Sequence, residues 1–393
     1  MSAARPLRVV VAGTGFGRVY LTALAAAGGP FELAGVLANG SDYSRQCARE
    51  YGAPLYTDPA QVPDDIDIVC VVVRSAATGG AGSQLAQQFL RRGLHVLQEH
   101  PVHHSEIAAC LQAAREGDAA YAVNTLHPNL APVRRFLAVA RYLRERQRLH
   151  YIDAASNSQM IYPVLDLIGR AAGGLRPWSF GEPLADSPAH PFRSLHGSVN
   201  GVPLSLRVQN QVHPEDPDNH SLLLGQVSLG CDAGVLILPD LHGPVLWNAR
   251  LHSPRDHGGR LLMRGPGSER LAVASTQTLG AIDTGDYHHV FADVWPGAVI
   301  YALHELRRDI ADPARRRRAG QWALSVSQAW RDLTGRIGLP ELIRPDEPQA
   351  LPLAELIAAA HAGDDDGADD ASATAPSSLR ANPAPSPDTL EIL

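Results

Sequence analysis

The stretch LRVVVAGTGFGRVYL, residues 7–21, combines a short apolar run, a glycine-rich turn and the beginning of a second apolar pattern. The run LRVVVA is typical of a strand that is buried on both faces of a parallel sheet. GTGFGRVYLTALAAAGG, which follows, has apolar residues at helical spacing. We therefore predict a strand, a tight turn and a helix as the first unit of an alternating α/β fold.

The alternation of apolar runs with helical segments continues as far as Thr125. Further strands are predicted at residues 31–38, 66–74, 94–100 and 120–125. The segments between them have helical spacing and end at glycines such as Gly52 and Gly93. Regular alternation of this kind predicts a Rossmann-type, doubly wound parallel sheet over residues 1–125.

The pattern changes after Thr125. An amphipathic helix is predicted at residues 128–147, β segments at 202–212, 220–231, 233–240 and 244–252, and two helices at 295–311 and 314–335. Adjacent β segments favour antiparallel pairing, so residues 126–360 are predicted to form an α+β domain with a mainly antiparallel open sheet. We expect this domain to bind the substrate and to form the contacts of an oligomer. Residues 361–393 are acidic, rich in alanine, proline and serine, and predicted to be a disordered tail.

Composition excludes several classes of function. The chain of 393 residues has 34 basic and 41 acidic side chains and a net charge of −7, without the basic excess of nucleic-acid-binding proteins. It begins with no signal peptide and contains no run of about 18 apolar residues, so we expect a cytoplasmic protein away from membranes. Four scattered cysteines indicate neither a disulfide framework nor a zinc site: Cys47, Cys70, Cys110 and Cys231.

The glycine turn predicts a dinucleotide site, because it follows the first strand and opens a helix. Gly13 permits a tight turn, Gly15 lets the backbone approach a pyrophosphate, and the helix N-terminus presents unpaired N–H groups to phosphates. A third glycine is expected where Arg18 stands, whereas Gly17 lies one residue earlier. The predicted cofactor-binding loop comprises Gly13, Thr14, Gly15, Phe16 and Gly17.

The end of the second strand distinguishes NAD from NADP. NAD-binding domains usually carry an acidic residue there, while NADP-binding domains carry hydroxyl and basic groups for the 2′-phosphate. Here the strand leads into NGSDYSR, where Ser41, Ser44 and Arg45 suit a phosphate and Asp42 suits the start of a helix. We therefore predict NADPH. Arg74, at the end of the third apolar strand, is expected either to contact cofactor or substrate, or to be a solvated side chain.

The stretch VLQEHPVHHSE, residues 96–106, contains three histidines. His100 ends a predicted strand at the carboxyl edge of the sheet, near the nicotinamide end of the cofactor, where it is a candidate proton donor. His103 and His104 are interpreted as a polar loop leading to a helix that begins with Ser105. A metal site would need ligands from elsewhere, so none is predicted.

His127, Glu99 and Asp166 are also assigned to the predicted site. His127 also follows a strand at the carboxyl edge and is the second candidate proton donor. Glu99 is expected to orient the ribose, to orient a catalytic neighbour or to hold the turn. Asp166 and Arg170 are four residues apart on a predicted helix, and a structural ion pair and a role in catalysis explain them equally well.

The Glu-His-Pro of residues 99–101 after a glycine-rich cofactor domain resembles the glucose–fructose oxidoreductase/inositol dehydrogenase superfamily, whose motif is usually Glu-Lys-Pro with a catalytic lysine. Together with LDLIGRAAGGLRPW, LHGPVLW and YALHELRRDI, it resembles the thiazolinyl imine reductases of yersiniabactin- and pyochelin-type siderophore biosynthesis. The resemblance runs from about Leu7 to Ile343. In that superfamily an aspartate and a histidine stand four apart in the second domain; Asp166 matches the first, and Arg170 replaces the second.

The resemblance implies NADPH-dependent reduction of a thiazoline C=N bond to a thiazolidine. The substrate would be tethered to a carrier domain of a nonribosomal peptide synthetase, and the enzyme would be a homodimer. A tyrosine is the candidate donor in members of this family where His127 stands here. The resemblance leaves His100 and His127 as alternative donors, with Asp166 as the third catalytic residue.

Two other functions compete with this one. An NAD(P)-dependent sugar or cyclitol dehydrogenase has the same fold, although oxidation of sugars relies on the lysine and histidine that are replaced here. A non-catalytic NADP-binding sensor is also compatible with the fold. The run Arg315–Arg318 is interpreted as a solvated helix face, with docking of an acidic carrier domain as the alternative.

Overall fold

The computed structural model describes residues 5–26, 29–73, 79–184, 190–282 and 285–365. It divides into two units, Met1–Ile343 and Arg344–Leu393. In the second unit, helix α10 (Leu353–Asp365) continues past His361, where the sequence predicts the disordered tail to begin. The rest of that predicted tail, residues 366–393, lies outside the described part of the chain.

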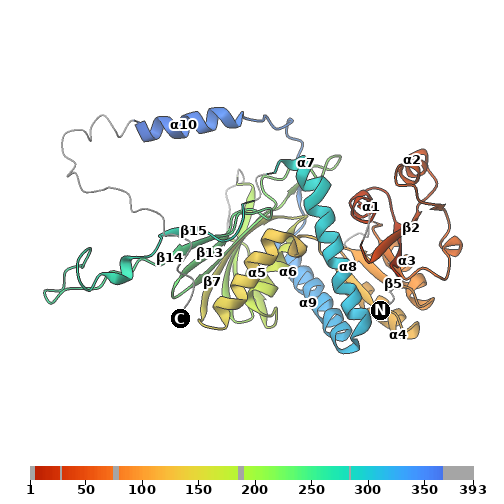
Figure 1. Cartoon of the computed structure of the whole chain (residues 1–393), viewed down its shortest axis with the longest axis horizontal. Helices are drawn as coiled ribbons and strands as arrows, with labels where there is room; N and C mark the ends of the chain where they lie inside the picture. The colour runs from red at the N-terminus through yellow and green to blue at the C-terminus, as the bar shows by residue number, and fades with distance from the viewer. Residues whose placement is uncertain (1–4, 27–28, 74–78, 185–189, 283–284, 366–393) are drawn as a thin grey trace. The chain divides into compact units, whose positions relative to one another are not determined.

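A six-stranded parallel sheet forms the N-terminal domain (Figure 1). Its strand order β3-β2-β1-β4-β5-β6 is that of a doubly wound sheet, which confirms the predicted Rossmann-type fold. The strands are β1 (Leu7–Ala12), β2 (Phe31–Leu37), β3 (Leu55–Tyr56), β4 (Ile68–Val71), β5 (His95–Glu99) and β6 (Tyr121–Asn124).

Both faces of this sheet are covered by helices, which explains the unbroken apolar runs. On β1, Val9 and Val11 belong to one apolar cluster, whereas Val10 and Ala12 belong to a second cluster on the opposite face. The domain's helices are α1 (Gly17–Ala25), α2 (Asp42–Glu50), α3 (Ala81–Arg91) and α4 (His104–Glu116), with a 3₁₀ turn η1 (Pro59–Gln61). Strand β1 is buried on both faces and ends at Ala12, so the glycine turn begins at the next residue, Gly13.

An eight-stranded sheet of order β15-β14-β13-β12-β7-β10-β9-β8 forms the second domain. Only β7 and β10 pair in parallel; the other neighbours are antiparallel, which confirms the predicted mainly antiparallel sheet. The strands are β7 (Leu149–Asn157), β8 (Trp178–Phe180), β9 (Phe192–Val199), β10 (Val202–Gln209), β12 (Gly225–Cys231), β13 (Gly234–Leu238), β14 (Leu246–Ala249) and β15 (Thr276–Thr278).

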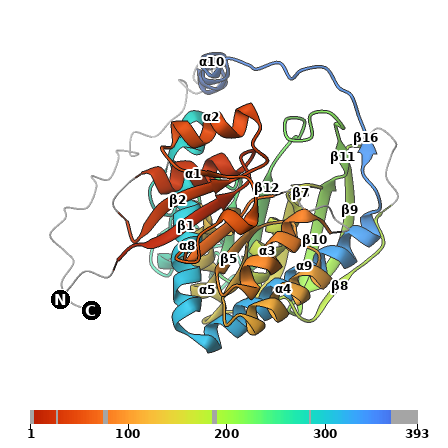
Figure 2. The same ribbon diagram turned by 90° about the vertical axis from the view of Figure 1, so that its right-hand side faces the viewer.

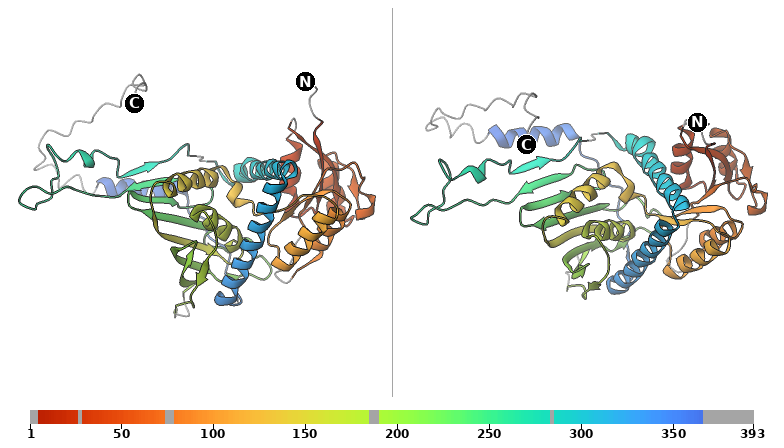
Figure 3. Two further views of the ribbon diagram at one scale, coloured as in Figure 1. Left: turned by 90° about the horizontal axis from the view of Figure 1, so that it is seen from below. Right: turned by 60° about the horizontal axis from the view of Figure 1, so that its bottom comes forward.

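One face of the large sheet packs against helices α5 (Ala131–Arg144) and α6 (Ile161–Ala172), as Figure 3 shows. Side chains of β10 alternate accordingly: Leu204 and Leu206 are buried, while Pro203 and Arg207 are exposed on the other face. This alternation is the reason that β10 is predictable from the sequence. The 3₁₀ turn η2 (His127–Asn129) connects β6 to α5.

Two long helices, α8 (Trp295–Ala311) and α9 (Pro313–Ile337), join the two domains. Helix α8 packs against α1, while α9 packs against both α4 and α6; Figure 2 shows α4 and α9 side by side. The remaining elements are short: β11 (Gln211–Val212), β16 (Glu341–Leu342), η3 (Glu269–Leu271), α7 (Tyr287–His289) and the π turn η4 (Val290–Val294).

The structure corrects the sequence prediction in two places. Helix α4 begins at His104 with His103 as its N-cap residue, so Ser105 lies inside the helix and is not its N-cap residue. Strands β7 and β9 are not predicted from the sequence, although β7 is central to the large sheet. All four cysteines are buried and free, and no helix among the described residues could span a membrane.

Candidate active site

The glycine turn between β1 and α1 has the geometry that a dinucleotide requires. Gly13 has φ +105°, and a Cβ there would lie 2.5 Å from the carbonyl oxygen of Val72, so no other residue fits. At Gly15 a Cβ would meet no atom within 4 Å, which leaves the space that a pyrophosphate needs. Thr14 is half-buried between these two glycines. A nicotinamide dinucleotide therefore fits this loop.

Gly17 takes the packing role of the missing third glycine. A Cβ on Gly17 would lie 3.4 Å from Cγ1 of Val11 on β1, so helix α1 approaches the sheet closely at this residue. Phe16, just before the helix, is 40 % exposed and its ring contacts Trp295 at 5.8 Å between centroids. Trp295 opens α8, so the loop and the second domain meet at this aromatic pair.

Of the three residues after β2 that are predicted to bind a phosphate, two are exposed and one is buried. Ser41 caps α2, and the exposed Arg45 lies 3.6 Å from Asp42. Ser44 is fully buried, and its hydroxyl donates to the carbonyl of Ser41 at 2.9 Å, so its side chain is not brought to the surface beside Ser41 and Arg45. Arg74 lies outside the described residues.

Arg18 and Tyr43, which are not predicted from the sequence as site residues, lie at the same place. The Arg18 guanidinium lies over the Tyr43 ring at 5.9 Å, and Tyr43 is 45 % exposed beside Ser41. A cation next to an exposed aromatic ring, at the N-terminus of α2, is suited to a nucleotide and its phosphate. The signal was present in the sequence, because Arg18 occupies the position of the third glycine.

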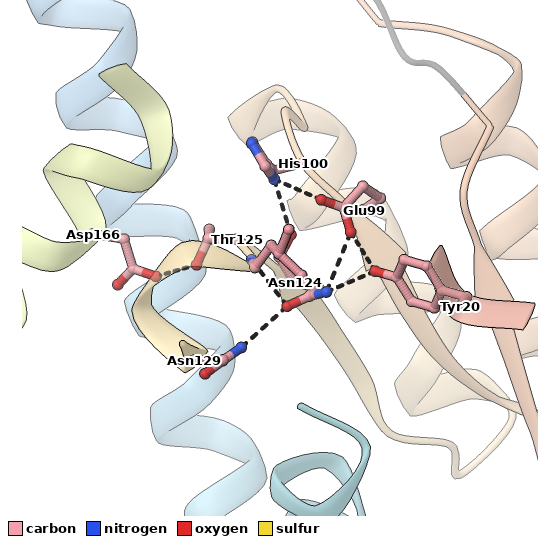
Figure 4. Close-up of polar contacts among 8 residues, drawn as sticks. Tyr20, Glu99, His100, Asn124, Thr125, Asn129 and Asp166 are labelled. Atoms are coloured by element: carbon pink, nitrogen blue, oxygen red, sulfur yellow. Dashed lines mark hydrogen bonds and ion pairs between the residues drawn. The ribbon is translucent and has the colours of Figure 1, made fainter. Parts of the chain in front are cut away.

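His100 follows β5 and is held by one group on β5 and one on the neighbouring strand β6 (Figure 4). Its Nδ1 donates to the carbonyl oxygen of Asn124 at 3.2 Å and lies 2.8 Å from Oε1 of Glu99. Both neighbours are acceptors, so Nδ1 carries the hydrogen. Nε2 is then the ring nitrogen without the hydrogen, and Figure 4 shows it directed away from Glu99.

Asn124, at the end of β6, connects the groups around His100. Its side-chain Nδ2 donates to Tyr20 Oη at 2.6 Å and to Glu99 Oε2 at 3.2 Å, and Tyr20 donates its hydroxyl to the same carboxylate oxygen. Tyr20 is fully buried, and both burial and the charge of Glu99 hold its pKa well above the usual value. Glu99 thus orients His100 and is bonded by Tyr20 and Asn124.

His127 occupies a different environment from His100. It is 4 % exposed, its ring meets Trp295 edge-on at 5.9 Å, and neither ring nitrogen has a hydrogen-bond partner among the described residues. Burial, followed by electrostatic repulsion from His100 and His242, lowers the pKa of His127 to about 3. His127 is therefore a neutral imidazole near pH 7, without the second ring proton that an imidazolium acid would donate.

Trp295 and His242 form the wall next to His127. Trp295 Nε1 donates to His242 Nε2 at 3.1 Å, and His242 Nδ1 lies 3.0 Å from Asp240 Oδ1. His242 is not predicted from the sequence as a site residue, because it lies in the loop between β13 and β14, where no strand-end pattern marks it. The place of His242 in the site depends on its contact with Trp295 of α8, and the sequence does not show this contact.

Asp166 does not contact His100 but belongs to a neighbouring network. Its carboxylate accepts from Thr125 Oγ1 at 2.5 Å, from Trp322 Nε1 at 2.6 Å and from Arg170 Nε at 2.7 Å. One turn earlier on α6, Tyr162 stacks on His100 with ring centroids 5.7 Å apart. Burial and the charge of Asp166 raise the pKa of Tyr162, so that Tyr162 stays neutral beside His100.

Two family models match this chain. Residues 7–125 match an oxidoreductase family with an NAD-binding Rossmann fold, and residues 147–248 match the C-terminal domain of Irp3-like thiazolinyl imine reductases. These two matches confirm the resemblance that the sequence motifs predict. None of the curated proteins matches the sequence.

Solved structures share the fold over most of the chain. KijD10, a 3-ketoreductase from Actinomadura kijaniata in complex with NADP, is 17 % identical over 87 % of this chain and 100 % of its own, with a TM-score of 0.57. UDP-N-acetylglucosamine 3-dehydrogenase GnnA from Acidithiobacillus ferrooxidans is 15 % identical over 86 % of this chain and 98 % of its own, with a TM-score of 0.58. GenD2 from gentamicin A biosynthesis, in complex with NAD, is 13 % identical over 84 % and 93 %, with a TM-score of 0.59.

The pKa of His127 predicts how acid affects stability. An unfolded histidine titrates near pH 6.5, whereas folded His127 titrates at about 3. Between these values only the unfolded chain binds the proton, so stability falls as the pH falls, by about 1.4 kcal/mol per pH unit for this group. We expect the His127→Gln variant to lose this contribution, which urea unfolding at pH 4, 5, 6 and 7 measures.

Exposed His257 provides the matched control. The His257→Gln variant is expected to keep the wild-type dependence of the free energy of unfolding on pH. Equal slopes for the wild type and His127→Gln would show that His127 is protonated in the folded protein over this range.

Proposed function

We propose that this chain, whose domains match an oxidoreductase family and the C-terminal domain of Irp3-like thiazolinyl imine reductases, uses NADPH to reduce a thiazoline C=N bond to a thiazolidine. The substrate we propose is an intermediate tethered to a carrier domain of a nonribosomal peptide synthetase. The observation that carries the proposal is the placement of His100, whose Nδ1 is held by Asn124 and Glu99 while Nε2 is left for a ligand.

The chemistry requires a hydride and a proton. The cofactor, held by Gly13–Gly17, supplies the hydride when bound. A proton must reach the imine nitrogen, because a protonated imine accepts hydride far more readily than a neutral one. His100 Nε2 delivers this proton, and Glu99 compensates the charge that the ring carries while it holds the proton.

The two histidines have different roles in this proposal. His127 is neutral because its pKa is lowered to about 3 by burial, so it contributes to the shape and polarity of the site rather than a proton. Tyr162 stacks on the ring of His100 and restricts its orientation. Of the two donors that the sequence leaves open, these surroundings favour His100.

The preference for NADPH rests on the groups at the N-terminus of α2. Ser41 and Arg45 are exposed there, Arg18 is adjacent over Tyr43, and the only acidic side chain of that turn, Asp42, contacts Arg45. A 2′-phosphate would meet two guanidinium groups and the helix N-terminus. NAD has no 2′-phosphate, so it would not make these contacts, and the groups at this turn favour NADPH over NADH.

Substitution of His100 tests the proposed acid. We expect His100→Ala to lower kcat by about 10²–10⁴-fold with NADPH and a thiazolinyl thioester, with little change in the KM for NADPH, because the variant loses the proton donor. His103→Ala, in the same histidine-rich stretch, is the control and is expected to retain wild-type kcat. Turnover is followed by the loss of NADPH absorbance and by mass spectrometry of the thiazolidine.

Two outcomes would contradict this proposal. NADPH consumption with sugars or cyclitols but not with thiazolines would favour a dehydrogenase of the wider superfamily. A fall in kcat of less than about tenfold in His100→Ala would remove His100 as the acid.

Substitution of Arg45 tests the choice of cofactor. We expect Arg45→Ala to raise the KM for NADPH by about tenfold or more, because a charge-assisted contact with the 2′-phosphate is lost, and to leave the KM for NADH unchanged. Arg49→Ala, an exposed arginine in the last turn of the same helix, is the control. Equal kcat/KM for NADH and NADPH in the wild type would refute the preference.

A further inference from the structure

A groove of about 700 Å³ lies among α5, α6, α8 and α9 beside strand β6. Thr125, Tyr162 and Asp166 line it, and so do apolar side chains including Leu137, Leu306 and Val326. His100 does not line the groove, although Tyr162, which does, stacks on His100. The groove therefore borders the candidate active site through Asn124 and Tyr162, but the proposed function gives no role to the arginines that line it.

The charge of the groove is opposite to the charge of the chain. Its lining includes six arginines and three carboxylates, an excess of three positive charges, whereas the whole chain carries a net charge of −7. The arginines are Arg134, Arg141, Arg144, Arg170, Arg315 and Arg318, and the carboxylates are Asp166, Glu305 and Asp309. Such local concentration of one sign of charge in a concave site attracts ligands of the opposite sign.

The carboxylates are already used by two of these arginines. Asp166 lies 2.7 Å from Arg170, and Arg315 pairs with Glu305 and with Asp309, the latter at 2.7 Å. In the described part of the chain, no carboxylate lies within 4.0 Å of the other four arginines. Among the described residues, these four guanidinium groups form no ion pair, although the charge of Arg318 acts on Asp312 from a longer distance.

Arg144 is the most informative of the four. Its Nε is buried, and among the described residues it has no hydrogen-bond partner. A buried charged donor without an acceptor costs free energy, and an anion in the groove would recover that cost. Arg134 differs, because its guanidinium lies over the Tyr301 ring at 4.2 Å.

The arginines reach the groove from separate helices. Arg134, Arg141 and Arg144 come from α5, at spacings that share one side of that helix, and Arg318 comes from α9. Guanidinium groups bind phosphate and carboxylate oxygens in pairs of parallel hydrogen bonds. The volume is that of a small-molecule site, and a concave site of this size suits a compact ligand better than a protein surface.

We propose that this groove binds a polyanionic small molecule, a phosphate ester or a polycarboxylate, through Arg141, Arg144 and Arg318. The apolar walls then contact the uncharged body of the ligand. Within the run Arg315–Arg318, Arg317 and Arg318 are exposed as a solvated face predicts, and Arg315 and Arg318 line the groove. The proposal stands independently of the reaction at His100.

Isothermal titration calorimetry tests the groove with two probes, inorganic pyrophosphate and citrate. The full chain is first saturated with NADP⁺, so that the glycine loop does not bind the probe. We expect at least one probe to bind, and Arg144→Gln and Arg318→Gln each to weaken its binding by about tenfold, because each removes a charge-assisted hydrogen bond. Arg318 is exposed, so that variant tests the groove without disturbing buried structure.

Arg307→Gln is the matched control, since Arg307 is an exposed arginine of α8 that does not line the groove. It is expected to bind both probes as the wild type does. Tighter binding of pyrophosphate identifies a phosphate ester, and tighter binding of citrate identifies a polycarboxylate. Absence of binding for both probes at millimolar concentration, or binding that neither Arg144→Gln nor Arg318→Gln weakens, would refute the site.

Discussion

The amide of Asn124 is the interaction on which the candidate active site depends. It is 1 % exposed, so each of its polar atoms must find a partner inside the protein. Nδ2 serves Tyr20 and Glu99, while Oδ1 accepts from the Leu126 N–H at 3.1 Å and from Asn129 at 3.1 Å. The backbone carbonyl of the same residue accepts from His100. One side chain thus joins helix α1, strand β5 and the turn that carries His127.

The hydrogen bonds of Asn124 also explain why His100 and His127 lie in different environments. Asn124 and Glu99 surround one nitrogen of His100 with acceptors, whereas the turn that follows Asn124 buries His127 without a partner. Leu126 adopts φ +50°, an uncommon conformation for a branched side chain, which the two bonds to Asn124 Oδ1 help to maintain. Two residues of the same type thus lie in environments that favour different protonation behaviour.

The sequence predicts those parts of the molecule that depend on local pattern. The parallel strands are visible because both faces of β1 are apolar, and the glycine turn because Gly13 and Gly15 follow directly. Strand β7 was missed because LHYIDAASN lacks clear alternation: its buried positions include Ile152 but also small or polar residues. Tyr20 and Asn124 could not be predicted as partners, because their contact depends on the packing of α1 against the end of β6.

The network around Asp166 bears on which reaction the site can perform. Oxidation of an alcohol needs a base, which sugar-oxidising relatives are expected to place on this helix, four residues after the aspartate. Here that position is Arg170, whose guanidinium does not titrate in proteins and is bonded to Asp166. Tyr162 stays neutral because its pKa is raised. The aspartate–histidine pair expected in sugar-oxidising relatives is therefore incomplete on α6, and His100 is the residue to which we assign the proton in the proposed reaction.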